Sequence, residues 1–228
     1  MSLVVEVGCL AELIKHDAHG ADLFRKQLRQ LNKFLATVNL NQHKEPENCS
    51  VFSADLYGYS GLHYMRRIAA YLSLRGVLPE PGGKDLEFED PSQDPSQDPV
   101  VEEYYQMVSQ VESGFDANLF KHLMFHDDSQ GFYIPQDFSS VLFPSESLGI
   151  GGAIGSSQKL NTECTLLAAA LELPLNLDYE STSMLEDTDS QGACNLRWIR
   201  YRIESFVCLR LHKASEHSLK TGAAIVFC

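Results

Sequence analysis

Residues 196–213, LRWIRYRIESFVCLRLHK, decide the fold class. Apolar side chains recur in this stretch every three or four residues, which is the spacing of a helix that buries one face. They are Ile199, Ile203, Phe206, Val207 and Leu211. A second stripe of the same period lies near the start of the chain, at Leu23, Phe24, Leu28, Leu31, Phe34, Leu35 and Val38. Two strong amphipathic helices, far apart in the sequence, predict a mainly helical protein.

The segments between these two helices carry shorter patterns of the same kind. Further helices are predicted at residues 9–14, 61–75, 100–111, 115–125 and 158–173. Short strands are predicted at 131–138 and 223–228. Ser60 and either Ser156 or Ser157 are the expected N-caps, and Gly76 is the expected stop of the helix that Ser60 begins. The predicted fold class is therefore mainly α (α+β), a helical globular domain with a few short strands.

The length of 228 residues fits one large domain or two small ones, and we expect a single globular domain spanning 1–228. Residues 79–99 hold five of the nine prolines, and the tetrapeptide PSQD occurs twice in tandem at 91–98. Proline at this density opposes both a helix and a central strand. We expect a flexible Pro-rich loop there, within the domain.

The net charge of −13 is concentrated in the middle of the chain. Residues 79–190 hold 22 acidic and 3 basic side chains. Such a segment repels nucleic acid and anionic membranes, so the expected partner is a basic protein or a cation, with no nucleic acid and no membrane. A solvated acidic surface that aids solubility is the simpler alternative. Arginines at 197, 200, 202 and 210 are expected to pair with this acidic middle.

The six cysteines are spread over the chain without a C-x-x-C pair, so neither a zinc ribbon nor a disulfide scaffold is indicated. The chain shows no secretory signal pattern and no apolar run long enough for a membrane span. These observations predict a reducing, cytoplasmic environment. They do not fix the oligomeric state.

The sharpest candidate site is His122 and His126 followed by Asp127 and Asp128. Histidines four residues apart share one face of a helix, and a following carboxylate would complete a mixed N/O set for a divalent transition metal. Leu123 follows the first histidine where a zincin needs Glu, which excludes that family. The alternative is a pair of partly buried histidines that only bind helix carbonyls.

A glycine-rich loop that leads into a helix gives a candidate anion site at Gly151, Gly152, Gly155 and Ser156. Its spacing differs from the known nucleotide fingerprints, because Ile154 stands where G-x-G-x-x-G needs glycine. Close packing of the loop before a serine N-cap is the alternative.

A third candidate is a partner-binding cluster of Tyr57, Tyr59, His63, Arg66 and Arg67. Tyrosine and arginine dominate binding hot spots. The alternative is a loop whose tyrosines cover a helix start while the arginines form surface ion pairs.

Two functional hypotheses remain open from the sequence. The first is a soluble, non-enzymatic protein-binding module with an acidic face, since no G-x-S-x-G or other complete catalytic signature is present. The second is a metal-binding protein or metal-dependent hydrolase using His122 and His126, with a further ligand such as Asp137, His63 or Glu163 close in space. The first hypothesis is preferred, although enzymatic activity is not excluded.

Overall fold

A computed structural model describes residues 3–81, 94–109, 119–178, 180 and 196–228 of the chain. It confirms the predicted mainly helical α+β class. The helices are α1 (Cys9–His16), α2 (Ala18–Thr37), α3 (Gly58–Arg75), α4 (Pro99–Ser109), α5 (Lys121–Met124), α6 (Ser157–Leu171), α7 (Arg197–Arg200) and α8 (Arg202–Thr221). The 3₁₀ turns are η2 (Pro95–Gln97) and η3 (Glu146–Leu148). The strands are β1 (Val4–Val7), β2 (Phe52–Asp55), β3 (Phe132–Ile134), β4 (Ile154–Ser156) and β5 (Ile225–Phe227).

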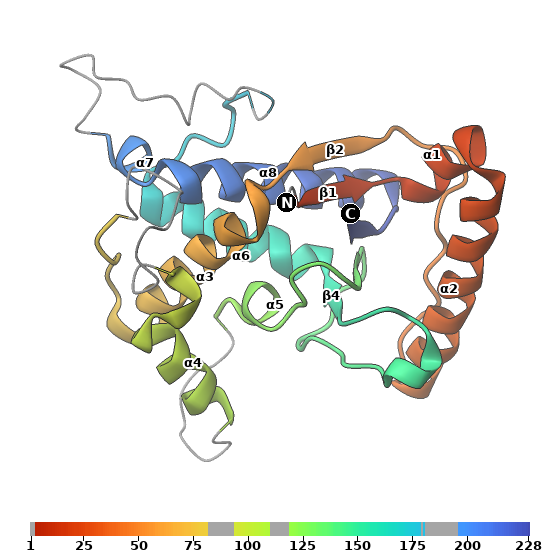
Figure 1. Cartoon of the computed structure of the whole chain (residues 1–228), viewed down its shortest axis with the longest axis horizontal. Helices are drawn as coiled ribbons and strands as arrows, with labels where there is room; N and C mark the ends of the chain where they lie inside the picture. Colours follow the sequence, from red (N-terminus) through yellow and green to blue (C-terminus); the bar gives the residue numbers. More distant parts are fainter. Residues whose placement is uncertain (1–2, 82–93, 110–118, 179, 181–195) are drawn as a thin grey trace.

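These strands form one sheet in the order β2-β1-β5-β3-β4. Neighbours are antiparallel except β3 and β4, which are parallel. The first and last strands pair near the middle of the sheet, where Val4 and Cys228 exchange both backbone hydrogen bonds, at 3.0 and 2.8 Å. The two ends of the chain therefore lie side by side (Figure 1).

The sheet separates two apolar cores because its side chains alternate between its faces. On β3, Tyr133 belongs to the core made with α3, α6 and α8, whereas Phe132 and Ile134 belong to the core made with α2. On β5, Ile225 and Val226 divide in the same way. One face is thus covered by three packed helices and the other by α2.

Helix α8 is more deeply buried than its stripe predicted. The expected single helix from Leu196 breaks at Tyr201 into α7 and α8, and α8 then continues to Thr221, where Gly222 ends it with φ of 80°. Its buried side chains include polar ones, among them Glu204, Arg210 and His212. The expected pairing of this region with the acidic middle is confirmed for Arg197, whose Nη2 lies 3.1 Å from Glu172 Oε1.

The expected helix boundaries are confirmed at two positions and shifted at a third. Ser156 caps α6 by accepting the N–H of Lys159, and Gly76 ends α3 with φ of 68°. Helix α3 begins at Gly58 instead of after Ser60, and Tyr57 precedes it in a left-handed conformation.

The Pro-rich segment is described only in part. Residues 82–93 lie outside the described residues, whereas the described part holds η2, which begins at Pro95, and Pro99, the first residue of α4. Proline is compatible with both positions, since the first residues of a helix need no backbone donor. Of the helix predicted at 115–125, the described residues contain α5 alone, which ends at Met124. Among the described helices, none combines the length and apolar character that a membrane span requires.

Candidate functional site

Five carboxylates lie along and beside η2 and α4, and we call this set the acidic edge: Glu80, Asp94, Asp98, Glu102 and Glu103. Helix α4 lies at the opposite end of the long axis from α2 (Figure 1). The acidic side chains also begin the local structure. Asp94 accepts the N–H of Ser96 at 2.9 Å, and Asp98 accepts that of Val100 at 2.9 Å, so each caps the turn that follows.

Two arginines of α3 hold the acidic edge in place. Arg67 donates its Nε to Asp98 at 2.6 Å and its Nη1 to the carbonyl oxygen of Glu80 at 2.9 Å. Arg75 binds Glu103 through both terminal nitrogens. The first pair is mostly buried and the second is exposed. Glu80 and Glu102 remain exposed.

The Tyr–Arg cluster predicted as a partner-binding surface is divided by the fold. Tyr59 is exposed and His63 is partly exposed, but Arg66 is buried. Tyr57 packs edge-on against Phe206 at a ring separation of 6.1 Å. The two arginines therefore bind within the chain, and a partner role for this cluster stays a prediction.

Arg66 stabilises the loop that follows α5. Its Nε donates to the carbonyl oxygen of Leu123 at 2.9 Å and its Nη2 to that of His126 at 2.5 Å. Its Nη1 binds Asp128, whose other oxygen lies 3.4 Å from Nε2 of His63. Carbonyl groups at the end of a helix lack partners within it, and a buried arginine satisfies them here.

Glu163 of α6 caps the start of α5 across space. Its two oxygens accept the backbone N–H groups of His122 and Leu123, at 2.9 and 2.7 Å. The two hydrogen bonds favour the ionised carboxylate, but burial has the larger effect and raises the pKa of Glu163 to about 8. A carboxyl group at this position therefore changes charge near neutral pH.

His122 is held as a neutral ring. Its Nδ1 accepts the backbone N–H of Ser156 at 3.0 Å, which leaves the proton on Nε2. Burial lowers the pKa of His122 to about 4. The hydroxyl of Tyr133 donates to the carbonyl oxygen of the same residue at 2.7 Å. His122 therefore connects α5, β3 and the start of α6.

His126 lies two residues beyond the end of α5, so the i,i+4 helical geometry does not apply to it. Its ring stacks on Tyr133 at 4.0 Å, and its nitrogens face the carbonyl oxygens of Asp127 and Phe132 at 3.0 and 3.1 Å. Burial lowers the pKa of His126 to about 4, and a neutral ring can donate to only one of these carbonyls.

The four predicted metal ligands do not share one open centre. Asp127 accepts the N–H of Ala153 at 2.5 Å, and Asp128 binds Arg66. Across the described part of the chain, no three His, Cys, Asp or Glu side chains are arranged to hold an ion. Of the suggested further ligands, Asp137 pairs with Lys159 at 3.0 Å. Metal binding at His122 and His126 stays a prediction from the sequence.

The glycine loop packs closely against its surroundings. Gly151 and Gly152 have φ of 88° and 133°, which other residues rarely adopt, and a Cβ on Gly155 would overlap the ring of Tyr133. The loop is anchored to α2, since Gln27 Nε2 donates to the carbonyl oxygen of Ile150 at 2.5 Å. These contacts explain the glycines, and an anion at Ser156 stays a prediction.

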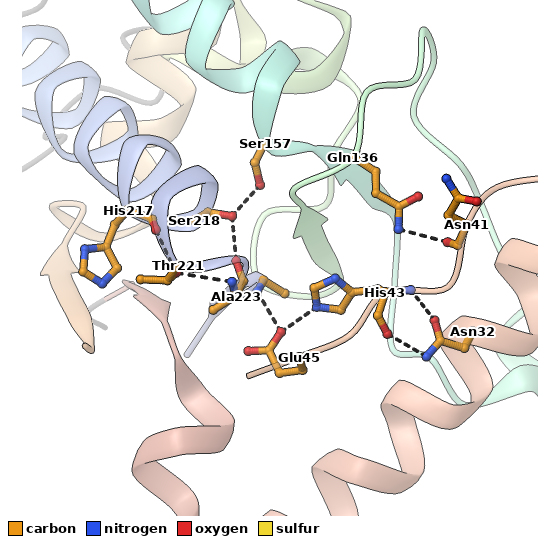
Figure 2. A network of polar contacts seen from close by, with 11 residues as sticks. Asn32, Asn41, His43, Glu45, Gln136, Ser157, His217, Ser218, Thr221 and Ala223 are labelled. Atoms are coloured by element: carbon orange, nitrogen blue, oxygen red, sulfur yellow. Dashed lines mark hydrogen bonds and ion pairs between the residues drawn. The ribbon is translucent and has the colours of Figure 1, made fainter. Parts of the chain in front are cut away.

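A further buried pair, His43 and Glu45, had no signal in the sequence beyond a polar loop. Figure 2 shows the pair with Asn32 of α2 on one side and Ala223, shortly before the last strand, on the other. Nε2 of His43 lies 2.6 Å from Glu45, which also accepts the N–H of Ala224 at 2.8 Å. Asn32 of α2 holds the backbone of His43 from both sides. The network connects residues 43–45 to α2 and to the segment that leads into the last strand, and we call it the clasp of His43 and Glu45. These contacts indicate a structural role.

Comparison with known proteins gives a single finding. The family described as "Putative DNA-mimic protein" matches residues 1–227. No curated protein and no solved structure matches the chain.

This match corrects two predictions from the sequence. The general acidic protein-binding module, and the metal-dependent hydrolase as its alternative, are not the function that the family describes. The prediction of an unspecified basic partner is corrected in the same way, because mimicry of DNA implies a partner that binds DNA, while the match does not contradict the exclusion of nucleic acid itself. The function and the partner were both predicted from the number of acidic residues. That number shows that a segment is acidic, but it does not show whether its carboxylates replace the phosphates of DNA.

Proposed function

We propose that this chain, which belongs to the DNA-mimic family, occupies the DNA-binding surface of a DNA-binding protein by presenting carboxylates in place of phosphates. The observation that carries the proposal is the excess of 22 acidic over 3 basic side chains in residues 79–190. A protein that binds duplex DNA recognises a dense row of negative charges, mostly through Lys and Arg. Carboxylates accept the same charge-assisted hydrogen bonds from these side chains.

The acidic edge is the described part of the chain that best fits this role. Glu102 is exposed in the first turn of α4, whereas Asp98 directly precedes the helix and is mostly buried against Arg67. Arg67 and Arg75 of α3 anchor the acidic edge through ion pairs with Asp98 and Glu103. Glu80 and Glu102 are exposed beside these pairs, so their carboxylates are available to a partner.

Two further features belong to the same proposal. The chain acts as one domain, in which the sheet and its two cores support the edge. It acts in the cytoplasm, where a DNA-binding partner is accessible and where the spacing of the cysteines predicts reduced thiols.

Elution from immobilised duplex DNA tests the proposal. DNA-binding proteins of the source cell are retained on the matrix, and the purified chain is then applied at low salt. We expect it to release a specific protein, which is then identified and purified. If no protein leaves the matrix, or if the released protein leaves equally well with any acidic protein of similar charge, the proposal fails.

A pair of charge variants connects the release to the acidic edge. Glu80→Gln/Glu102→Gln removes two exposed charges from the edge, and Glu12→Gln/Glu47→Gln removes two charges outside it, one on α1 and one that pairs with Arg25 of α2. We expect the first variant to release the partner several-fold less effectively and the second to behave as the unmodified chain. Equal loss in both would mean that net charge alone causes release.

A further inference from the structure

A groove lies between α2 and η3, on the side of the molecule away from the acidic edge. Its volume is about 570 Å³, and its lining includes Leu13, Leu23, Phe24 and Leu148 together with Lys26 and Gln27. We call it the α2 groove. Its volume lies within the range of ordinary ligand-binding pockets, although it is an open groove along a helix.

The groove concentrates exposed apolar surface. Leu23 is 55% exposed and Leu148 is 38% exposed, and Ile14, next to the lining residue Leu13, is 37% exposed. Single exposed leucines are common on protein surfaces, but apolar side chains that meet in a concave site with a polar rim mark binding surfaces.

Both walls of the groove are held rigidly. The inner face of α2 is buried against the sheet through Phe24, Leu28 and Leu31, and Asp17 caps its first turn by accepting the N–H of Gly20. The opposite wall is fastened to α2 by the hydrogen bond from Gln27 to Ile150. The groove is therefore preformed, which lowers the entropic cost of binding.

A row of unpaired cations runs along the same helix. Lys26, Arg29 and Lys33 follow at intervals of three and four residues, so they share one stripe of α2. All three are exposed, and none forms an ion pair with any described residue. Arg25, by contrast, pairs with Asp22 and Glu47. Three unpaired cations on one stripe are unexpected in a chain with a net charge of −13.

We propose that the α2 groove docks an amphipathic helix of a partner protein, with its apolar side chains between α2 and η3 and its carboxylates against Lys26, Arg29 and Lys33. Helix-in-groove recognition combines these two features in the same way. Glu146 is the acidic residue of η3, so the carboxylates of the bound helix lie on the α2 side. This interaction is separate from DNA mimicry, since the groove and the acidic edge do not overlap.

Two synthetic peptides of about 15 residues test the proposal. One carries a leucine stripe with glutamate elsewhere, and the other has glutamine in place of each glutamate. Binding of the labelled peptides to the full chain is followed by fluorescence anisotropy at low salt. We expect the glutamate peptide to bind at one site and roughly tenfold more tightly than the glutamine peptide. Failure of both to bind, or equal binding of the two, would overturn the proposal.

Three variants place the binding in the groove. Leu23→Ser/Leu148→Ser removes exposed apolar surface, and Lys26→Gln/Arg29→Gln removes two of the cations. Each is expected to weaken binding of the glutamate peptide roughly tenfold. Lys213→Gln/Lys220→Gln makes the same charge change on α8 and is expected to leave binding within about twofold. If Lys26→Gln/Arg29→Gln and Lys213→Gln/Lys220→Gln weakened peptide binding equally, the placement of the peptide in the α2 groove would be contradicted.

Light scattering of the unmodified chain separates this partner from a second copy of the chain. We expect a monomer at the concentrations used for binding. A dimer that dissociates in Leu23→Ser/Leu148→Ser would mean that the groove is an interface between copies, and it would overturn the proposal. The substituted side chains are exposed, apart from the partly exposed Lys213, so circular dichroism melting is expected to show the native fold in every variant.

Discussion

The carboxyl group of Glu163, in the middle of α6, accepts the backbone N–H of His122 at 2.9 Å and thereby caps a helix that begins 42 residues earlier in the chain. The same carboxyl group accepts the N–H of Leu123. The first turn of α5 has no side-chain cap of its own, because Phe120 stands at its N-cap position. Glu163 therefore fastens α5, and through it the loop that carries Asp127 and Asp128, to the central helices.

Stability is expected to fall as the pH rises from 6.5 to 8, and Glu163→Gln is expected to remove this fall. Burial raises the pKa of Glu163 to about 8 from 4.5, so the folded state keeps a proton that the unfolded state has lost. The contribution is complete below pH 4.5 and is lost as the pH rises through 8. Over this window the loss is about 1–2 kcal/mol, since one pKa unit corresponds to about 1.36 kcal/mol. Urea unfolding of both proteins at several pH values measures it, and parallel pH profiles would contradict the assignment.

The two buried histidines are expected to destabilise the fold in acid. Burial lowers the pKa values of His122 and His126 from 6.5 to about 4, so the unfolded state binds protons that the folded state does not. Their contribution is complete above pH 6.5 and is lost as the pH falls toward 4. Glu163 raises the stability as the pH falls below 6.5, which would mask the effect of the histidines. The unfolding free energy is therefore measured in the Glu163→Gln background. Adding His126→Gln is expected to reduce the acid-induced loss by about half, and an unchanged slope would refute this.

The ion pair of Arg67 and Asp98 is expected to contribute more to the free energy of unfolding than the ion pair of Arg75 and Glu103. The first pair is mostly buried and Asp98 also caps α4, whereas the second is exposed on both sides. Arg67→Ala leaves a poorly solvated carboxylate and is expected to cost about 2–3 kcal/mol. Arg75→Ala is expected to cost less than about 1 kcal/mol. Thermal or urea unfolding of the two variants checks the order, and equal costs would mean that the first pair does not anchor the acidic edge.

Much of the helical framework could be predicted because its information is local. The stripe from Leu23 to Val38 gives α2, and Ser156 and Gly76 mark helix ends by their own chemistry. The strand at the end of the chain was also predicted, but not that β5 would pair with β1 near the middle of the sheet. Strands β1, β2 and β4 were missed, although they are no shorter than β3 and β5, which were predicted.

The sites could not be predicted to the same extent, because their contacts join distant segments. Arg66 was expected at a surface, yet it is buried against the carbonyls of Leu123 and His126. The clasp of His43 and Glu45 depends on Asn32 and on Ala224, at the other end of the chain. The acidic middle was visible from composition alone, but its meaning required the family match.

Competition between this chain and duplex DNA for one purified partner is the most direct test of the central claim. A labelled duplex is bound to the partner identified by elution, and the chain is added while anisotropy is recorded. The account predicts that about one equivalent releases the duplex and that the chain binds more weakly as salt rises, as a substitute for phosphates should. A partner that binds the chain and the duplex at the same time, with the duplex still bound at saturation, would contradict it.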